Sequence, residues 1–341
     1  MAENLPTSSR RRLSPALVLF FLSPMVGELL SSSAPPAEFF NPVGFLMLSV
    51  LYGGGAILVR ELVLLWGKGW PSLLALGAAY GIAEEGLMCK SFFDPGWMDV
   101  GMLGWYGRWL GVNWVWAFEL TIYHAAFSIL IPITLTGLIF PDRRQHAWTS
   151  TRRLWLLFAV WTLNGLVIFL AISKYHPSGL HLGAAFLAIA GLCVLARRLP
   201  WPVAPRGQQN EKLGRPWRLA ILGFVGTMAL FLLAWALPAT RVHPTVVIGS
   251  MVLLVVVLVH RLWRLSGRNG FSDAHRLALI SGALGLFILV LAPVREWSPN
   301  QPDNPTGMSI VALAALVFLL WLRRRMRSRL NAGSAGVTAP Q

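Results

Sequence analysis

The chain has 341 residues, of which 55% are hydrophobic and only 13% are charged, and its formal net charge is +15. Soluble domains carry about 25% charged residues, so the composition excludes an ordinary soluble protein. Several apolar runs reach the roughly 18 residues that a helix needs to cross a bilayer. The sequence therefore predicts an all-α, polytopic integral membrane protein.

Ten membrane-spanning helices are predicted along the chain. They cover residues 13–31, 43–66, 70–93, 109–139, 154–173, 180–196, 216–237, 244–263, 274–292 and 308–322. The first span resembles a signal peptide, but its apolar run is longer than usual and Glu28 interrupts its end. A retained first helix is therefore the favoured interpretation.

The positions of Lys and Arg predict the orientation, because positively charged loops stay in the cytoplasm. Basic residues collect before the first span, in the 141–153 linker, in the 197–218 loop and in the tail after residue 322. Both termini are thus predicted to be cytoplasmic, in the plasma (inner) membrane of a bacterium whose Arg-rich composition indicates a GC-rich genome. The same topology explains the positive net charge, so membrane lipid is the expected partner and nucleic acid is not.

Polar residues within the spans are unevenly distributed. The first four spans contain Glu28, Arg60, Glu61, Glu84, Glu85, Glu119 and His124, whereas the later spans contain no acidic residue. We therefore divide the chain into a functional part (1–140), a basic cytoplasmic linker (141–153), a supporting bundle of helices 5–10 (154–322) and a basic cytoplasmic tail (323–341).

The stretch "YGIAEEGLMCKSFF" at residues 80–93 places two adjacent glutamates inside a predicted span. At 1.5 Å per residue, Glu84 and Glu119 both lie on the order of 14 Å below the outer boundary, and Glu28, His124 and the glycines at 53–55 lie at nearby depths. One intramembrane carboxylate costs about 2.5–3.5 kcal/mol. Such costs predict that these groups share protons, partners or water at one site.

Helical geometry separates the two glutamates. On an ideal helix Tyr80, Glu84 and Ser91 share one face, whereas Glu85 points about 100° away. One glutamate is then expected to face a cavity, while the other contacts a neighbouring helix or orients the site. On the next span, His124 and Ser128 share a stripe with Thr121, and Glu119 lies to its side.

The predicted outer loop, "DPGWMDVGMLGWYGRW", is rich in tryptophan. The simpler interpretation is an interfacial aromatic belt, because such rings prefer the headgroup layer. The alternative is a lid that lines an entrance for lipid or peptide. Under the second interpretation the candidate substrate-binding residues are Trp97, Trp105, Tyr106 and Arg108.

The segments "AEEGLMCK" and "HAAFS" resemble motifs of the CPBP, or Rce1-like, intramembrane proteases, over about fifty residues. That family carries EExxxR, FxxxH and a later HxxxN or HxxxD. The resemblance implies that Glu84 activates water with Glu85 as its companion, and that His124, with Ser128, is a polarising or metal-associated histidine. Cys89 stands at the arginine position with Lys90 one residue later, and Leu120 stands where phenylalanine is expected.

Three functions remain open at this point. The first is an intramembrane hydrolase for a membrane-embedded peptide or a lipid-linked substrate, with a carboxylate as general base. Its catalytic candidates are Glu84, Glu85, His124 and Glu119, with Glu28, Tyr80, Lys90 and Ser128 in support. The alternatives are a proton-coupled transporter or lipid-handling protein, in which the carboxylates relay protons, and a non-catalytic scaffold.

A divalent metal such as zinc would need three protein ligands and an open position for water. Glu84 and His124 are the main candidates, Glu85 and Glu119 are alternatives, and His181 is an outer candidate. An arginine or second histidine near Glu84 would favour the hydrolase. A polar path through to Arg60 and Glu61 would favour the transporter.

Overall fold

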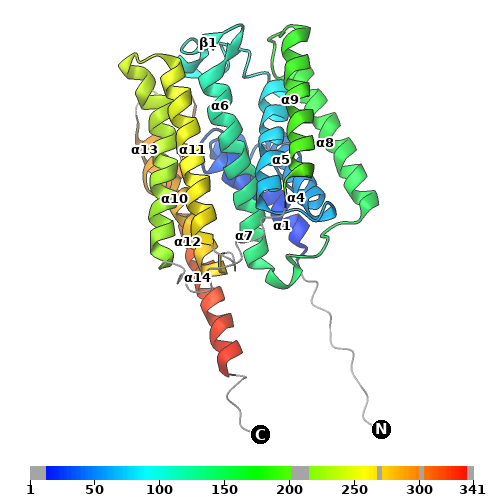
Figure 1. Cartoon of the computed structure of the whole chain (residues 1–341), viewed down its shortest axis with the longest axis vertical. Coiled ribbons are helices and arrows are strands. Elements are labelled where there is room, and N and C mark those ends of the chain that lie inside the picture. Colours follow the sequence, from blue (N-terminus) through cyan, green and yellow to red (C-terminus); the bar gives the residue numbers. More distant parts are fainter. Residues whose placement is uncertain (1–12, 201–214, 267–270, 299–302, 336–341) are drawn as a thin grey trace.

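The computed structural model describes residues 13–200, 215–266, 271–298 and 303–335. Within them the chain is a bundle of long, roughly parallel helices (Figure 1). The crossing segments of the first half are α1–η1 (Pro15–Pro24, Met25–Leu29), α3–η2–α4 (Pro42–Leu48, Ser49–Gly54, Gly55–Leu65), α5–η3 (Trp70–Ile82, Ala83–Met88) and α6–η5–α7 (Trp114–Tyr123, His124–Leu130, Ile131–Ile139). The first and last residues of each segment lie close to those of a predicted span.

The second half adds six further crossing segments. They are α8 (Thr151–Ala171), α9 (Gly179–Arg198), α10–η7–η8 (Pro216–Phe231, Leu232–Ala236, Leu237–Thr240), α11 (Pro244–Ser266), α12–η9–α13 (Asp273–Leu286, Phe287–Leu291, Ala292–Trp297) and α14 (Met308–Ala335). The prediction of an all-α polytopic membrane protein is confirmed. Short elements complete the described chain: α2 (Pro36–Phe39), η4 (Gly101–Gly104), β1 (Arg108–Trp109), β2 (Val112–Asn113) and η6 (Pro141–Arg143).

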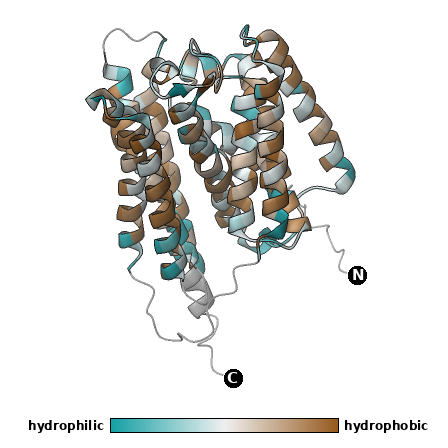
Figure 2. Ribbon diagram, turned by 45° about the horizontal axis from the view of Figure 1, so that its top comes forward, coloured by the Kyte–Doolittle hydropathy of each residue, from teal (hydrophilic) through white to brown (hydrophobic). Residues whose placement is uncertain are grey.

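Seven of the described segments are both long and apolar enough to cross a membrane by composition alone. The remaining three crossing segments fail one of these two conditions for visible reasons. Pro15–Leu29 is short, Trp70–Met88 contains Glu84 and Glu85, and α14 continues into the arginines that follow Leu322. Figure 2 shows hydrophobic residues along the middle of the helices and hydrophilic residues near their ends, as a bilayer requires.

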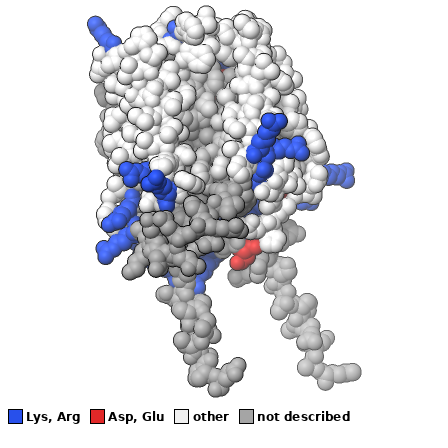
Figure 3. All heavy atoms as spheres, in the orientation of Figure 1, with Lys and Arg blue, Asp and Glu red and all other residues white. Residues whose placement is uncertain are grey.

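The two ends of the bundle differ in charge. Where α1 begins and α14 ends, Lys and Arg collect on the surface (Figure 3); we call this the arginine-rich end. The loop of residues 94–113 lies at the opposite end (Figure 1); we call this the tryptophan-rich end. This difference in charge between the two ends agrees with the prediction that the basic loops all lie on one side of the membrane.

The predicted fourth span begins five residues too early. Residues 108–113 form a two-stranded antiparallel hairpin, with Arg108 opposite Asn113 and Trp109 opposite Val112. Its turn residues, Leu110 and Gly111, both have positive φ, at 49° and 76°. Two left-handed residues in succession are typical of a tight hairpin turn, so the helix begins only at Trp114.

Helices α6 and α7 lie between two groups of helices. On one side α5 packs against α9 and α8 packs against η2, while on the other side α10 packs against α12. Helix α1 lies against η2 so closely that a Cβ atom at Gly53 would be 2.0 Å from the carbonyl oxygen of Phe20. The Gly53–Gly55 triplet therefore serves close helix packing.

Candidate functional site

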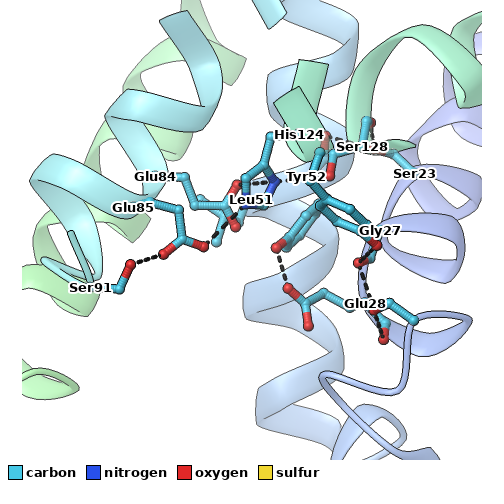
Figure 4. Close-up of polar contacts among 12 residues, drawn as sticks. Ser23, Gly27, Glu28, Leu51, Tyr52, Glu84, Glu85, Ser91, His124 and Ser128 are labelled. Atoms are coloured by element: carbon cyan, nitrogen blue, oxygen red, sulfur yellow. Dashed lines mark hydrogen bonds and ion pairs between the residues drawn. The ribbon is translucent and has the colours of Figure 1, made fainter. Parts of the chain in front are cut away.

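Two glutamates and a histidine meet between α5–η3 and α6–η5, deep inside the protein (Figure 4). His124 Nε2 lies 3.1 Å from Glu85 Oε1, and His124 Nδ1 lies 3.3 Å from Glu84 Oε2. The same Nδ1 lies 2.9 Å from Ser128 Oγ, one helical turn further along the chain. All three side chains are buried, so the imidazole is held between two carboxylates away from solvent.

The two helices approach closely because one of them presents glycine at the contact. A Cβ atom at Gly81 would be 2.9 Å from His124 Cβ, and one at Gly77 would be 2.9 Å from Ala125 Cα. These glycines are four residues apart and face the same neighbour, which is the small-xxx-small arrangement of membrane helices. The "GAAYG" segment at residues 77–81 thus brings His124 within reach of Glu84 and Glu85, which follow Gly81 by about one turn.

Each helix that supplies the site widens there into a π-helical turn. Glu28 lies in η1, Tyr52 in η2, Glu84 and Glu85 in η3, and His124 and Ser128 in η5. A π-helical turn contains more residues than an α-helical turn and is found frequently at functional sites. Glu84 and Glu85 are adjacent, yet both reach the same imidazole on the neighbouring helix.

A third carboxylate lies nearby, on α1–η1. Glu28 Oε1 accepts a short hydrogen bond from the Tyr52 hydroxyl, and Tyr52 also stands beside His124, with ring centroids 5.9 Å apart. Tyr80 and Tyr123 flank the same imidazole at 6.0 and 5.5 Å. Three tyrosines thus enclose the histidine.

Two further side chains hold Glu85 in place. Ser91 Oγ donates a short hydrogen bond to Glu85 Oε2, and the Trp116 indole N–H donates to the same Ser91 oxygen over 3.0 Å. Sequence reasoning placed Ser91 on the face of Glu84, and it did not find Tyr52, Trp116 or Ser23 as site residues. Their position within predicted spans was the one sequence feature that indicated a site. Serine, tyrosine and tryptophan are also common where helices simply pack together.

Ser23 joins the backbones of the surrounding helices. Its hydroxyl lies 2.6 Å from the carbonyl oxygen of Ser128 and 3.1 Å from that of Tyr52. Both carbonyls belong to the π-helical turns η5 and η2, where the regular backbone hydrogen bonding is disturbed. The serine therefore stabilises the widened backbone on which the site depends.

Three buried oxygen atoms around the site take part in no hydrogen bond among the described residues. They are Glu84 Oε2, the Tyr80 hydroxyl and Glu119 Oε2. Buried polar groups are nearly always hydrogen-bonded in native proteins, and exceptions indicate a functional group or a bound water or ion. Glu84 Oε2, which lies 3.3 Å from His124 Nδ1, therefore marks the part of the site at which a ligand could bind.

The cluster fits a divalent metal ion in the nature and spacing of its donors. One ligand atom from each of Glu84, Glu85 and His124 can be chosen so that all three lie within 4.8 Å of one another. Histidine nitrogen and carboxylate oxygen are common zinc ligands, and three of them leave a fourth position for water. A carboxylate has two oxygens, so Glu84 can offer one to an ion and keep the other for a proton.

Glu119 lies outside this cluster although it is on the same helix as His124. Its Oε1 accepts a hydrogen bond of 3.3 Å from the indole N–H of Trp235 in η7. It is therefore not one of the three groups that could share an ion. Trp235 is a contribution of the second half of the chain to the surroundings of the site.

Lys90 and His181 are also held elsewhere. The Lys90 ammonium donates to the carbonyl oxygens of Phe169 and Ser173, at 2.8 and 2.7 Å, near the C-terminal end of α8. His181 Nε2 lies 2.8 Å from the carbonyl oxygen of Leu110 in the hairpin turn. In the described part of the chain, His124 is the one basic side chain that forms an ion pair with either of the two glutamates.

The four loop candidates lie at the tryptophan-rich end. Arg108 donates to the Phe93 carbonyl oxygen over 2.9 Å, and the Tyr106 hydroxyl donates to the Val242 carbonyl oxygen over 2.6 Å. Trp97 packs against the buried residues beneath the loop, whereas Trp105 is 74% exposed. The loop is thus anchored by internal contacts, and Trp105 is the most exposed of the four candidates.

Arg60 and Glu61 form a separate buried pair near the arginine-rich end. Arg60 Nη2 donates to the carbonyl oxygens of Arg144 and His146, and its guanidinium lies 3.9 Å above the ring of Trp148. Glu61 Oε1 accepts from the Trp148 backbone N–H over 3.1 Å. Among the described residues no chain of hydrogen bonds joins this pair to the cluster, so the pair fastens the 141–153 linker.

The fold and the site together define a multi-pass membrane protein with a buried glutamate–histidine centre. The chain belongs to a family described as an uncharacterized membrane protein family, whose model matches residues 17–234. The matched region contains Glu28, Tyr52, Glu84, Glu85 and His124. The comparisons with curated proteins and with solved structures gave no match.

Proposed function

We propose that the protein is a metal-dependent hydrolase that acts within the membrane. The observation that carries the proposal is the convergence of Glu84, Glu85 and His124, together with the buried Oε2 of Glu84 that takes part in no hydrogen bond. A site of this kind costs stability in a membrane, and intramembrane ionisable residues are by default functional. Water activation requires a base beside an electrophilic centre, which these groups can provide.

The contacts of each side chain indicate its role in the reaction. Glu84 is the general base, because its buried Oε2 faces His124 Nδ1 at 3.3 Å without a hydrogen bond of good geometry and can receive a proton from water. His124 is oriented by Ser128 and Glu85, and Glu85 is oriented by Ser91. A bound divalent ion would supply Lewis acidity, which makes water a stronger nucleophile at neutral pH. The residues that would hold it are Glu84, through its other oxygen, Glu85 and His124.

The resemblance of "AEEGLMCK" and "HAAFS" to CPBP motifs supports the same assignment. It favours a membrane-embedded peptide as substrate, with a lipid-linked molecule as the alternative. The expected entrance is the tryptophan-rich end, where Trp105 is exposed above the helices. The expected location is the plasma membrane, with this end on the outer side.

A proton relay is the second candidate, and the hydrogen bond between Tyr52 and Glu28 favours it. The Tyr52 and His124 rings are also in contact, with centroids 5.9 Å apart, so Glu28, Tyr52, His124 and Glu85 are neighbouring groups able to carry protons. Such a series suits a proton-coupled transporter. In a scaffold, by contrast, neither chemistry would be present.

The test compares the wild-type protein with Glu84→Gln, and uses Glu38→Gln, an exposed carboxylate, as the matched control. Purified wild-type protein and the control should hold about one transition metal ion per chain, whereas His124→Ala should release it. Membranes from cells that express the wild type or Glu38→Gln should contain new peptide N-termini that are missing with Glu84→Gln.

The same proteins distinguish the alternatives. If the protein is metal-free and moves protons into vesicles, and Glu84→Gln abolishes this movement, the result would support the proton relay and contradict the hydrolase. If the protein shows no metal, no new peptide ends and no proton flux, only the scaffold function would remain. A lipid-linked substrate would be recognised by a released headgroup in place of new peptide ends.

A further inference from the structure

A large groove lies between the two groups of helices, on the other side of α6–η5–α7 from the cluster. Its volume is about 800 Å³, within the roughly 300–1,000 Å³ of small-molecule sites. One wall consists of α4, α5 and α6–η5–α7, and the other of α10, α11 and α12. Figure 3 shows the surface hollowed between these two groups.

The first wall is separate from the proposed hydrolase site. Ile122, Ala126, Leu130 and Ile133 line the groove, and their spacing of three and four residues places them on one face of the helix. His124, between the first two of them, points to the glutamates on the opposite side. The groove and the cluster therefore use different faces of one helix.

The second wall is apolar. On α11 the groove is lined by Leu254, Leu258 and Leu262, which are half-buried. Val252 and Val256 on the same helix are exposed and do not line it. A surface of this composition at membrane depth is suited to hydrocarbon chains rather than to a polar ligand.

Cations lie at the arginine-rich end of the groove. Lys68, Arg144 and Arg276 all line it there, and one acid, Asp273, serves two of them. Arg144 Nη1 lies 2.9 Å and Arg276 Nη1 3.6 Å from the same Asp273 Oδ1.

Lys68 forms no ion pair in the described structure, and its ammonium donates to the carbonyl oxygen of Leu199 over 2.9 Å. The neighbouring Arg60 is already neutralised by Glu61. Lys68, Arg144 and Arg276 thus carry three positive charges, and Asp273 balances one of them. The excess among the described residues is two positive charges at this end of an apolar groove. A ligand with hydrocarbon chains and a negative headgroup matches both the apolar walls and the positively charged end of the groove.

We propose that the groove binds an anionic phospholipid from the leaflet that surrounds the arginine-rich end. The phosphate lies between Lys68 and Arg276, and the acyl chains extend along Leu130 and Leu254. Charge-assisted hydrogen bonds from Lys or Arg to phosphate are stronger than neutral ones. An anionic lipid is therefore selected over a zwitterionic one of equal chain length. This inference does not depend on the hydrolase.

The first experiment measures lipid retention. Delipidated protein is exchanged into equal amounts of phosphatidylglycerol and phosphatidylethanolamine with the same chains, and bound lipid is counted by native mass spectrometry. The wild type should prefer phosphatidylglycerol by about tenfold, equivalent to about 1.4 kcal/mol. Lys68→Gln combined with Arg276→Gln should lose this preference.

The matched control is Arg152→Gln combined with Arg153→Gln, which removes the same charge from the exposed start of α8, outside the groove. It should retain the wild-type preference. An equal loss in both double variants would overturn the proposal, because general attraction to the protein surface would then account for it. No preference in the wild type would also overturn it.

The second experiment locates the lipid. A phosphatidylglycerol with a photoreactive acyl chain should crosslink to Leu254 and Leu258 in preference to Val252 and Val256, on the exposed face of the same helix. Equal labelling of the two faces would overturn the proposal, since bulk lipid would then explain the contact. A dimer whose interface fills the groove would also overturn it, and size measurement with light scattering would detect that dimer.

Discussion

His124 and Glu85 contact each other across two helices although 39 residues separate them in the chain, with His124 Nε2 3.1 Å from Glu85 Oε1. Glu84 contacts the other nitrogen of the same ring. The imidazole thus bridges two adjacent carboxylates, both of which lie in the π-helical turn η3 at residues 83–88.

Glu84→Gln should keep the protein folded while it abolishes activity. Glutamine has nearly the same volume and removes a carboxylate whose burial is costly, and His124 keeps Glu85 as its ion-pair partner. The melting temperature in detergent should therefore be unchanged or higher. Activity is measured as the appearance of new peptide ends. A variant that fails to accumulate in the membrane would show instead that Glu84 is structural.

Glu61→Gln should behave in the opposite way. Glu61 pairs with buried Arg60, and removing one partner of a buried ion pair typically costs about 3–5 kcal/mol. Thermal unfolding should therefore occur at a clearly lower temperature than in Glu84→Gln, while the metal content per folded chain stays constant. Equal stability of the two variants would contradict a fastening role for the Arg60–Glu61 pair.

Gly81→Ala should disturb the site through helix packing. A Cβ atom there would meet His124 Cβ at 2.9 Å, and overpacking of this kind typically costs about 1–3 kcal/mol. We expect lower stability and reduced metal content. The control is Gly183→Ala on α9, where a Cβ atom meets nothing within 4 Å. Both variants add one methyl group, so a loss in the control as well would refute the packing argument.

The membrane orientation can be tested by cysteine labelling. In a background without cysteine, an impermeant thiol reagent added from outside should modify Asp99→Cys in the tryptophan-rich loop and should not modify Gln145→Cys in the 141–153 linker. The positive-inside rule is the physical reason, because the linker contains Arg143, Arg144, Arg152 and Arg153. The reverse labelling pattern would invert the proposed orientation.

Hydrophobicity and charge predicted the membrane spans to within a few residues, since both follow directly from the properties of the bilayer. The sequence also indicated that Glu84 and His124 lie at similar depths. It did not predict that Glu85 contacts the same ring, because that contact depends on how closely two helices pack against each other. Long-range partners such as Tyr52 and Trp116 could not be predicted, because they depend on which helices are neighbours.

Lys90 illustrates another limit of sequence reasoning. Its position shortly after the glutamates predicted a supporting role in the site, yet it has a positive φ of 63° and turns away from them. Its ammonium instead binds carbonyl oxygens at the end of α8. A break in the helix between residues 88 and 90 decides this outcome, and hydrophobic pattern alone does not locate such a break.

The contact between Gly53 and Phe20 bears on how this family can diverge. Any side chain at position 53 would overlap the Phe20 carbonyl oxygen, and backbone cannot move aside as a flexible side chain can. Relatives that keep this helix pair should therefore have glycine in that alignment column, whatever their function. Gly183 and Gly191 lie in open surroundings and should be freely replaced during evolution.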